Sequence, residues 1–252
     1  MRTLVLALLL LAVLPAIAEE KETLYENDLE IRTFWTFKVT DAAVQKLLPA
    51  GWELNSPAAG PSKGFNLGLL FINQTLAQDP EGNPRTPQNY AVLIAPAKKT
   101  GTDIAALMVI SGFIAKEVVP GAYGVYGPAK VTGERRQQIE AEGKASVEES
   151  WEVKADDGSA LEVHVQFVRG QPTRGKGEAK IYSAAKPDFY RLYRYEQAAD
   201  LVRSTATGVD RASNVSIKAS GPNISPLFDG SEQLLSITSI PFYFRSIYLP
   251  VP

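Results

Sequence analysis

The chain has 252 residues, of which 45% are hydrophobic and 21% charged, so it is too apolar to be wholly disordered. Without cysteine it cannot form disulfides, and with a single histidine it cannot build the usual zinc sites. Its 26 basic and 28 acidic side chains give a net charge of −2, without the excess of Lys and Arg typical of nucleic-acid binders. No phosphate-binding glycine motif occurs. We therefore expect no nucleic acid, no metal ion and no cofactor.

The first residues have the pattern of a secretory signal peptide. Arg2 precedes an apolar run over residues 4–14, and small residues at positions 16 and 18 form a cleavage site. The run is shorter than the roughly 20 apolar residues that span a bilayer, so we expect no membrane anchor after cleavage. A chain without cysteine does not depend on disulfides once exported. We expect residues 1–18 to be removed and residues 19–252 to form one domain, secreted into a bacterial periplasm.

Most of the remaining chain shows apolar residues with period two, which is typical of strands with one buried face. One short helix is expected after Thr40 or Asp41, because apolar residues follow at helical spacing before Pro49. The loop predictions are residues 79–84, which are rich in Pro, Gly and Asn, and residues 170–177. Strands are expected over residues 31–39, 64–73, 90–95, 104–114, 188–196, 209–219 and 234–249, the last broken at Pro241.

A hairpin is predicted around Asp156-Asp157-Gly158-Ser159. Alternating segments flank this turn over residues 145–155 and 160–168, and Asp-Gly is a strong hairpin signal. No repeat and no linker divides the chain. The pattern predicts one mainly β domain of α+β class, with a few short helices, built as a closed or double-layered barrel.

Two residues of this hairpin are candidates for chemistry. Glu149 falls in the apolar row of its strand, where a carboxylate is either paired, held neutral, or turned outward by a bulge. His164 lies on the polar face of the next strand, which meets solvent or lines an interior cavity. An inward Glu149 would be a site candidate.

The segment over residues 120–131 gathers glycines, prolines, Tyr123, Tyr126 and Lys130. Glycines let the backbone bend or approach a ligand, and tyrosines offer hydroxyls beside an apolar cavity. A lysine in apolar surroundings loses its proton more readily and can form a Schiff base with a carbonyl. The other interpretation is an ordinary lysine that faces solvent.

Four segments resemble the acetoacetate decarboxylase family. Residues 36–54 resemble its opening strand and a helix that ends in Leu-Leu-Pro, and residues 123–130 are similar to its glycine-rich approach to Pro-Lys-Lys. Residues 187–192 and 240–250 match later strands in the expected order. The resemblance covers nearly all of residues 19–252. It implies a β-barrel or cone-shaped double-sheet fold around an apolar pocket, often assembled into homo-oligomers.

Position by position, the resemblance does not preserve the catalytic set of the family. Pro-Lys-Lys becomes Pro128-Ala129-Lys130, so Ala129 takes the place of the Schiff-base lysine and Lys130 that of its neighbour. Shifting this comparison by one residue would align Lys130 with the Schiff-base lysine of the family. The positions that match the family's other site residues carry Tyr123, Asn66, Tyr90 and Glu30, with Arg32 close to the last.

These observations favour a binding protein for a small, largely apolar organic ligand that carries a carbonyl, carboxylate or phenol, without classical decarboxylase activity. The alternative is a carbon–carbon lyase, of decarboxylase or aldol type, that uses Lys130 as the Schiff-base nucleophile. A third interpretation is a barrel that binds a partner and has no ligand. The expected catalytic candidates are Lys130, Glu149 and Tyr123, and the expected ligand-binding residues are Arg32, Asn66, Tyr90 and Tyr126.

Overall fold

The computed structural model of the chain describes residues 21–251, which are folded mainly as strands. The signal-peptide prediction for residues 1–18 lies outside these residues. In the described part, the helices are α1 (Asp41–Gln45) and the single 3₁₀ turn η1 (Lys116–Val118), and neither is long and apolar enough to cross a membrane. The strands are β1 (Glu22–Lys38), β2 (Trp52–Leu54), β3 (Leu67–Gln78), β4 (Asn89–Lys99), β5 (Ala105–Ile114), β6 (Tyr126–Ile139), β7 (Ala145–Ala155), β8 (Ala160–Val168), β9 (Thr173–Ser183), β10 (Tyr190–Ser204), β11 (Val209–Asp210), β12 (Ala212–Ser220) and β13 (Gln233–Pro250).

Most of these strands form a closed ring. The pairing runs β5–β9–β10–β13–β1–β3–β4, and β4 pairs in turn with β5. All these pairs are antiparallel except β5–β9, which is parallel. Since side chains alternate between the two faces of a strand, every second residue of the ring points into its interior.

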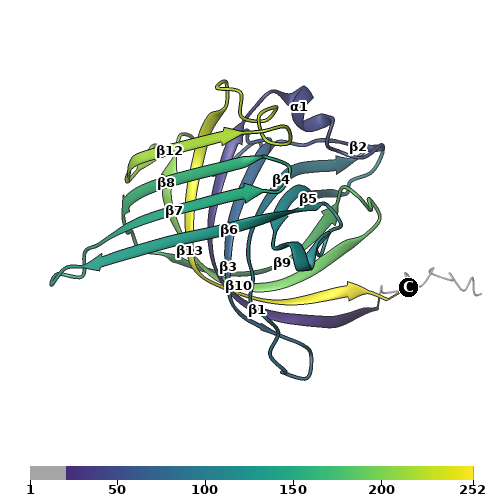
Figure 1. Cartoon of the computed structure of the whole chain (residues 1–252), viewed down its shortest axis with the longest axis horizontal. Helices are drawn as coiled ribbons and strands as arrows, with labels where there is room; N and C mark the ends of the chain where they lie inside the picture. Colours follow the sequence, from purple (N-terminus) through teal and green to yellow (C-terminus); the bar gives the residue numbers. More distant parts are fainter. Residues whose placement is uncertain (1–20, 252) are drawn as a thin grey trace, which may run out of the picture.

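Strands β6, β7, β8 and β12 form a second sheet, which joins the ring where β6 pairs with β5. In Figure 1 these strands run across β13, β1 and β3. The outer face of the ring packs against this sheet through one large apolar core, in which Phe71 of β3 stacks on Trp151 of β7 with ring centroids 5.4 Å apart. The ring therefore has a covered outer face and a separate interior.

The predicted mainly β fold is confirmed, and so is the hairpin, because β7 and β8 flank a turn at residues 156–159. Two local predictions are wrong. Residues 173–177, expected in a loop, belong to β9, since pairing with β10 overrides their turn-rich composition. Strand β13 continues through Pro241, where a break was expected. Strand β6, which was not predicted, extends from the glycine-rich segment to Ile139.

Candidate functional site

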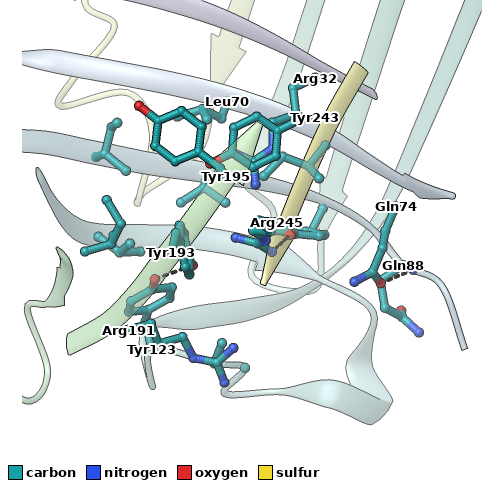
Figure 2. A pocket seen from close by; sticks show the side chains of 18 of the residues that line it. Arg32, Leu70, Gln74, Gln88, Tyr123, Arg191, Tyr193, Tyr195, Tyr243 and Arg245 are labelled. Atoms are coloured by element: carbon teal, nitrogen blue, oxygen red, sulfur yellow. Dashed lines mark hydrogen bonds between the residues drawn. The ribbon is translucent and has the colours of Figure 1, made fainter. Parts of the chain in front are cut away.

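The interior of the ring contains a cavity of about 870 Å³. Its β4, β5 and β9 wall is apolar, with Val92, Ile94, Val109 and Ile181 among its members. Its β1, β10 and β13 wall is rich in arginine and tyrosine. A largely apolar cavity with a few convergent polar groups is the usual form of a small-molecule site. Figure 2 shows the polar wall, with Arg32, Leu70, Gln74, Gln88, Tyr123, Arg191, Tyr193, Tyr195, Tyr243 and Arg245 labelled.

The centre of the polar wall is a hydrogen-bonded cluster around Arg245 of β13. Its Nη2 donates to Asp28 Oδ2 at 2.9 Å, to Glu30 Oε1 at 2.8 Å and to the Tyr90 hydroxyl at 3.1 Å. Tyr90 in turn donates to Glu30 Oε1 at 3.0 Å. Gln74 donates to the second oxygen of Asp28 at 3.0 Å. Because two carboxylates share one guanidinium, each carboxylate shifts the other's titration.

The pKa values of the two carboxylates in this cluster are shifted in opposite directions. Burial, reinforced by the negative charges of Glu30 and Glu26, raises the pKa of Asp28 to about 7, against the opposing attraction of Arg245. Burial would also raise the pKa of Glu30, but the charges of Arg245 and Arg32, with their hydrogen bonds and that of Tyr90, lower it. Glu30 is therefore the permanent anion of the cluster, and Asp28 exchanges a proton near neutral pH.

Arg32 of β1 extends the cluster toward the other end of the cavity. Its Nε donates to Glu30, and its guanidinium lies over the Tyr243 ring, 3.5 Å from the ring centroid. Arg32 is only 6% exposed, and within residues 21–251 its Nη2 has no hydrogen-bond partner. A buried donor without a partner costs free energy, so this N–H can receive an acceptor from a bound molecule.

A group of tyrosines closes the cavity on the side of residues 121–126. The hydroxyls of Tyr123 and Tyr193 are hydrogen-bonded to each other. The Tyr126 ring packs where Gly112 and Gly121 have no side chains, since a Cβ at either position would come within 2.4 Å of that ring. Burial raises the pKa of both Tyr123 and Tyr126. These phenols therefore stay protonated and act as hydrogen-bond donors or acceptors.

The structure brings together four of the predicted residues, since Arg32, Tyr90, Tyr123 and Tyr126 all line the cavity. They come from strands β1, β4 and β6 and from the loop before β6. Their roles toward a ligand stay predictions.

The other three predicted residues lie elsewhere. Lys130 is exposed and is absent from the cavity wall, because Ala129 and Val131 take the inward positions of β6 and pack in the core between the sheets. The expectation that Lys130 faces an apolar cavity is wrong. Asn66, which was also expected in the cavity, does not line it. Its side chain donates to the Val39 carbonyl at 2.7 Å and accepts from the Val39 N–H at 2.9 Å.

Glu149 points inward, but into the core between the two sheets instead of the cavity. It is 3% exposed, and its carboxylate accepts hydrogen bonds from Trp151 Nε1 at 2.7 Å, from Thr33 and from Arg135. Of the alternatives that the sequence left open, the structure shows the paired carboxylate. His164 lies on the opposite face of β8, away from this core, in a shallow groove on the outside of the second sheet.

Sequence reasoning found Arg32 but missed Asp28 and the residues that β10 and β13 contribute to the polar wall. Asp28, Glu30 and Arg32 have period-two spacing and share one face of β1, which is a signal that could have been used. Arg191, Tyr193 and Tyr195 have the same spacing on β10. No local pattern in the sequence indicates that Arg245 lies beside β1 or β10. Within residues 21–251, no cluster of three or more acidic or histidine side chains could hold a metal ion.

No protein-family model matches the sequence, and no curated protein matches it. Solved structures do match. The enduracididine biosynthesis enzyme MppR with HEPES bound superposes with a TM-score of 0.56 at 10% identity, covering 90% of this chain and 86% of that chain. An acetoacetate decarboxylase-like enzyme from Sphingomonas wittichii RW1 superposes with a TM-score of 0.53 at 11% identity, covering 93% of this chain and 94% of the other.

The chain has the acetoacetate decarboxylase-like fold. This confirms the resemblance found in the sequence and the fold class that it implied. MppR has also been solved in complex with pyruvate, in a structure with a TM-score of 0.55 and 10% identity that covers 93% of this chain and 90% of that chain. At such identities the likeness is one of fold, and it transfers no activity.

Proposed function

We propose that this acetoacetate decarboxylase-like protein binds a small, largely apolar organic molecule inside its ring and does not act as a Schiff-base decarboxylase. The cavity of about 870 Å³ carries the proposal, because its size falls within the roughly 300–1,000 Å³ of ordinary ligand pockets. The apolar wall would bury the body of the ligand, and the arginines and tyrosines would orient its carbonyl, carboxylate or phenol group.

The position of the lysines supports the second half of the proposal. Residues 1–20 and 252 contain no lysine, so every lysine of the chain lies in the described part, and none of them lines the cavity. An imine must form between a lysine amine and the carbonyl of the bound molecule. A molecule held inside the ring has no such amine beside it, and the exposed Lys130 lies outside.

The uncharged fluorescent probe N-phenyl-1-naphthylamine tests the binding site. We expect it to bind once per chain, with increased emission, because the cavity removes it from water. Ala179→Trp fills the cavity from β9 and should abolish binding, whereas Lys176→Trp, at an exposed position of the same strand, should not. Equal binding by both variants would place the probe elsewhere and contradict the proposal.

The same preparation tests the chemistry. After incubation with acetoacetate and borohydride, we expect the mass of the chain to stay unchanged. A covalent adduct that Lys130→Ala removes would instead support the lyase alternative.

The cellular setting is part of the same proposal: cleavage after residue 18 and export to a periplasm, with assembly of identical chains. Amino-terminal sequencing and light scattering of the exported protein check these two points.

A further inference from the structure

Arg191 of β10 is the arginine of the cavity wall whose charge has no carboxylate partner among the described residues. It is 9% exposed, and its Nε is buried without a hydrogen-bond partner among the described residues. Its guanidinium lies 5.0 Å from the centroid of the Tyr25 ring and 5.8 Å from that of Tyr123. Figure 2 shows it beside Tyr123, on the far side of Arg245 from Arg32.

The other arginines of the wall all have carboxylate partners. Arg32 pairs with Glu30, Arg245 with Asp28 and Glu30, and Arg85 with Glu26 at 2.7 Å. Among residues 21–251, no carboxylate forms an ion pair with Arg191, and its close neighbours are aromatic rings. Cation–π contacts compensate a buried charge only in part. A guanidinium kept inside a cavity without a counter-charge is suited to an anion that arrives with the ligand.

The rest of the cavity indicates the form of that ligand. The carboxylates of the wall are already engaged by other arginines: Asp28 and Glu30 by Arg32 and Arg245, and Glu26 by Arg85. The charge left over near Arg191 is therefore positive. Apart from the Tyr90 hydroxyl, which is bonded within the Arg245 cluster, the β4, β5 and β9 wall offers apolar contacts, through residues such as Val92, Ile94 and Val109. A ligand that satisfies both features has one anionic end and an apolar body.

We propose that Arg191 binds the carboxylate of an amphipathic monocarboxylic acid whose hydrocarbon body lies along the β4, β5 and β9 wall. The inference rests on the proposed function, because it assumes that the cavity is a ligand site, and it adds the class of ligand and the residue that selects it. Tyr25 and Tyr123 flank the guanidinium and hold it toward the cavity.

The experiment compares two ligands that share a tail and differ in the head group, dodecanoate and dodecanol. Titration calorimetry measures both, below the micelle concentration of dodecanoate and below the solubility limit of dodecanol. The wild-type protein is expected to bind dodecanoate about 10- to 100-fold more tightly than dodecanol, the usual effect of a charged hydrogen bond. Arg191→Gln should lose that preference and keep its affinity for dodecanol. Arg194→Gln removes the same charge three residues along β10, from a half-exposed side chain bonded to Glu178, and should change neither affinity.

Three outcomes would overturn the inference in distinguishable ways. Equal binding of both ligands by the wild type, unchanged in Arg191→Gln, would leave a cavity that binds apolar molecules without a carboxylate site. A loss of both affinities in Arg191→Gln, with a lowered melting temperature, would make Arg191 a structural support for Tyr25 and Tyr123. Binding of neither ligand would contradict the proposed function along with the inference.

Discussion

Two buried polar clusters lie on opposite faces of strand β1. Glu30 and Arg32 point into the ring, whereas Thr33 points outward to Glu149 in the core between the sheets. Around Glu149 both carboxylate oxygens are bonded and apolar side chains fill the surroundings. Around Glu30 the hydrogen bonds are equally numerous, but Arg32 keeps a free donor and a large cavity lies alongside.

The difference shows that a buried charge alone does not mark a functional site. A polar cluster whose donors and acceptors are all paired within it stabilises one arrangement of the core. A cluster with donors left over beside a cavity can instead accept a ligand. Even the closed core has one unpartnered donor, the indole N–H of Trp35, but that group is neutral and faces no cavity.

The largest expected effect concerns the closed cluster. Glu149→Gln removes the counter-charge of Arg135 in a largely buried setting, and we expect the free energy of unfolding to fall by about 3–5 kcal/mol. Urea denaturation measures this change. Glu148→Gln, next along β7 and half-exposed, is the control and should cost less than about 0.5 kcal/mol. If Glu149→Gln abolished binding of the naphthylamine probe without lowering stability, the two clusters would not differ as described.

The next effect concerns Asp28 in the open cluster, whose pKa is raised to about 7 by burial and its acidic neighbours. An unfolded Asp titrates near 3.9, so between roughly pH 4 and pH 7 the folded chain binds more protons at this site. The free energy of unfolding should therefore decrease as pH rises through that window, by on the order of 3 kcal/mol from this group. Asp28→Asn should remove the decrease.

Urea denaturation of the wild type and of Asp28→Asn, from pH 4 to pH 8, measures the difference. The arginines lower the pKa of Glu30, so its contribution changes only below about pH 5 and with the opposite sign; the decrease between pH 5 and pH 7 therefore belongs to Asp28. A difference between the two proteins that stays constant with pH would mean that Asp28 is ionised throughout.

The smallest effect compares two neighbours on β4 that point to opposite sides. Leu93 is fully buried in the core between the sheets, and Ile94 lines the cavity. Leu93→Ala leaves a new void and should lower the free energy of unfolding by about 3 kcal/mol. Ile94→Ala only enlarges an existing cavity, so its loss should be about 1–2 kcal/mol smaller than that of Leu93→Ala. Equal losses in urea denaturation would indicate that the ring interior is packed as densely as the core.

Secondary structure was predicted best where the pattern of apolar and polar residues is simple. The hairpin at residues 156–159 and strands β4 and β5 alternate or run apolar as their burial requires. Strand β1 was expected only from residue 31, because its earlier part points acidic side chains inward. A polar interior reverses the usual pattern, so a functional wall is where periodicity is least informative.

The candidate site was predicted in part for the same reason. The glycines and tyrosines of residues 120–126 did indicate a cavity, and Tyr123 and Tyr126 line it. Lys130 was expected beside them, but successive residues of β6 face opposite sides, and the two buried neighbours leave Lys130 on the outside.

By itself, the sequence determined the class of the protein: mainly β, without cysteine, with the acetoacetate decarboxylase-like fold and without the Lys-Lys pair of that family. Composition and period-two alternation are local properties, and they suffice for the mainly β class. The fold and the missing Lys-Lys pair came from the resemblance of four segments to that family. Only the tertiary structure decided which charges meet, because Asp28 and Arg245 lie 217 positions apart and become neighbours through the pairing of β1 with β13. The same closure of the ring places Arg191 beside the cavity, where none of the carboxylates in residues 21–251 forms an ion pair with it.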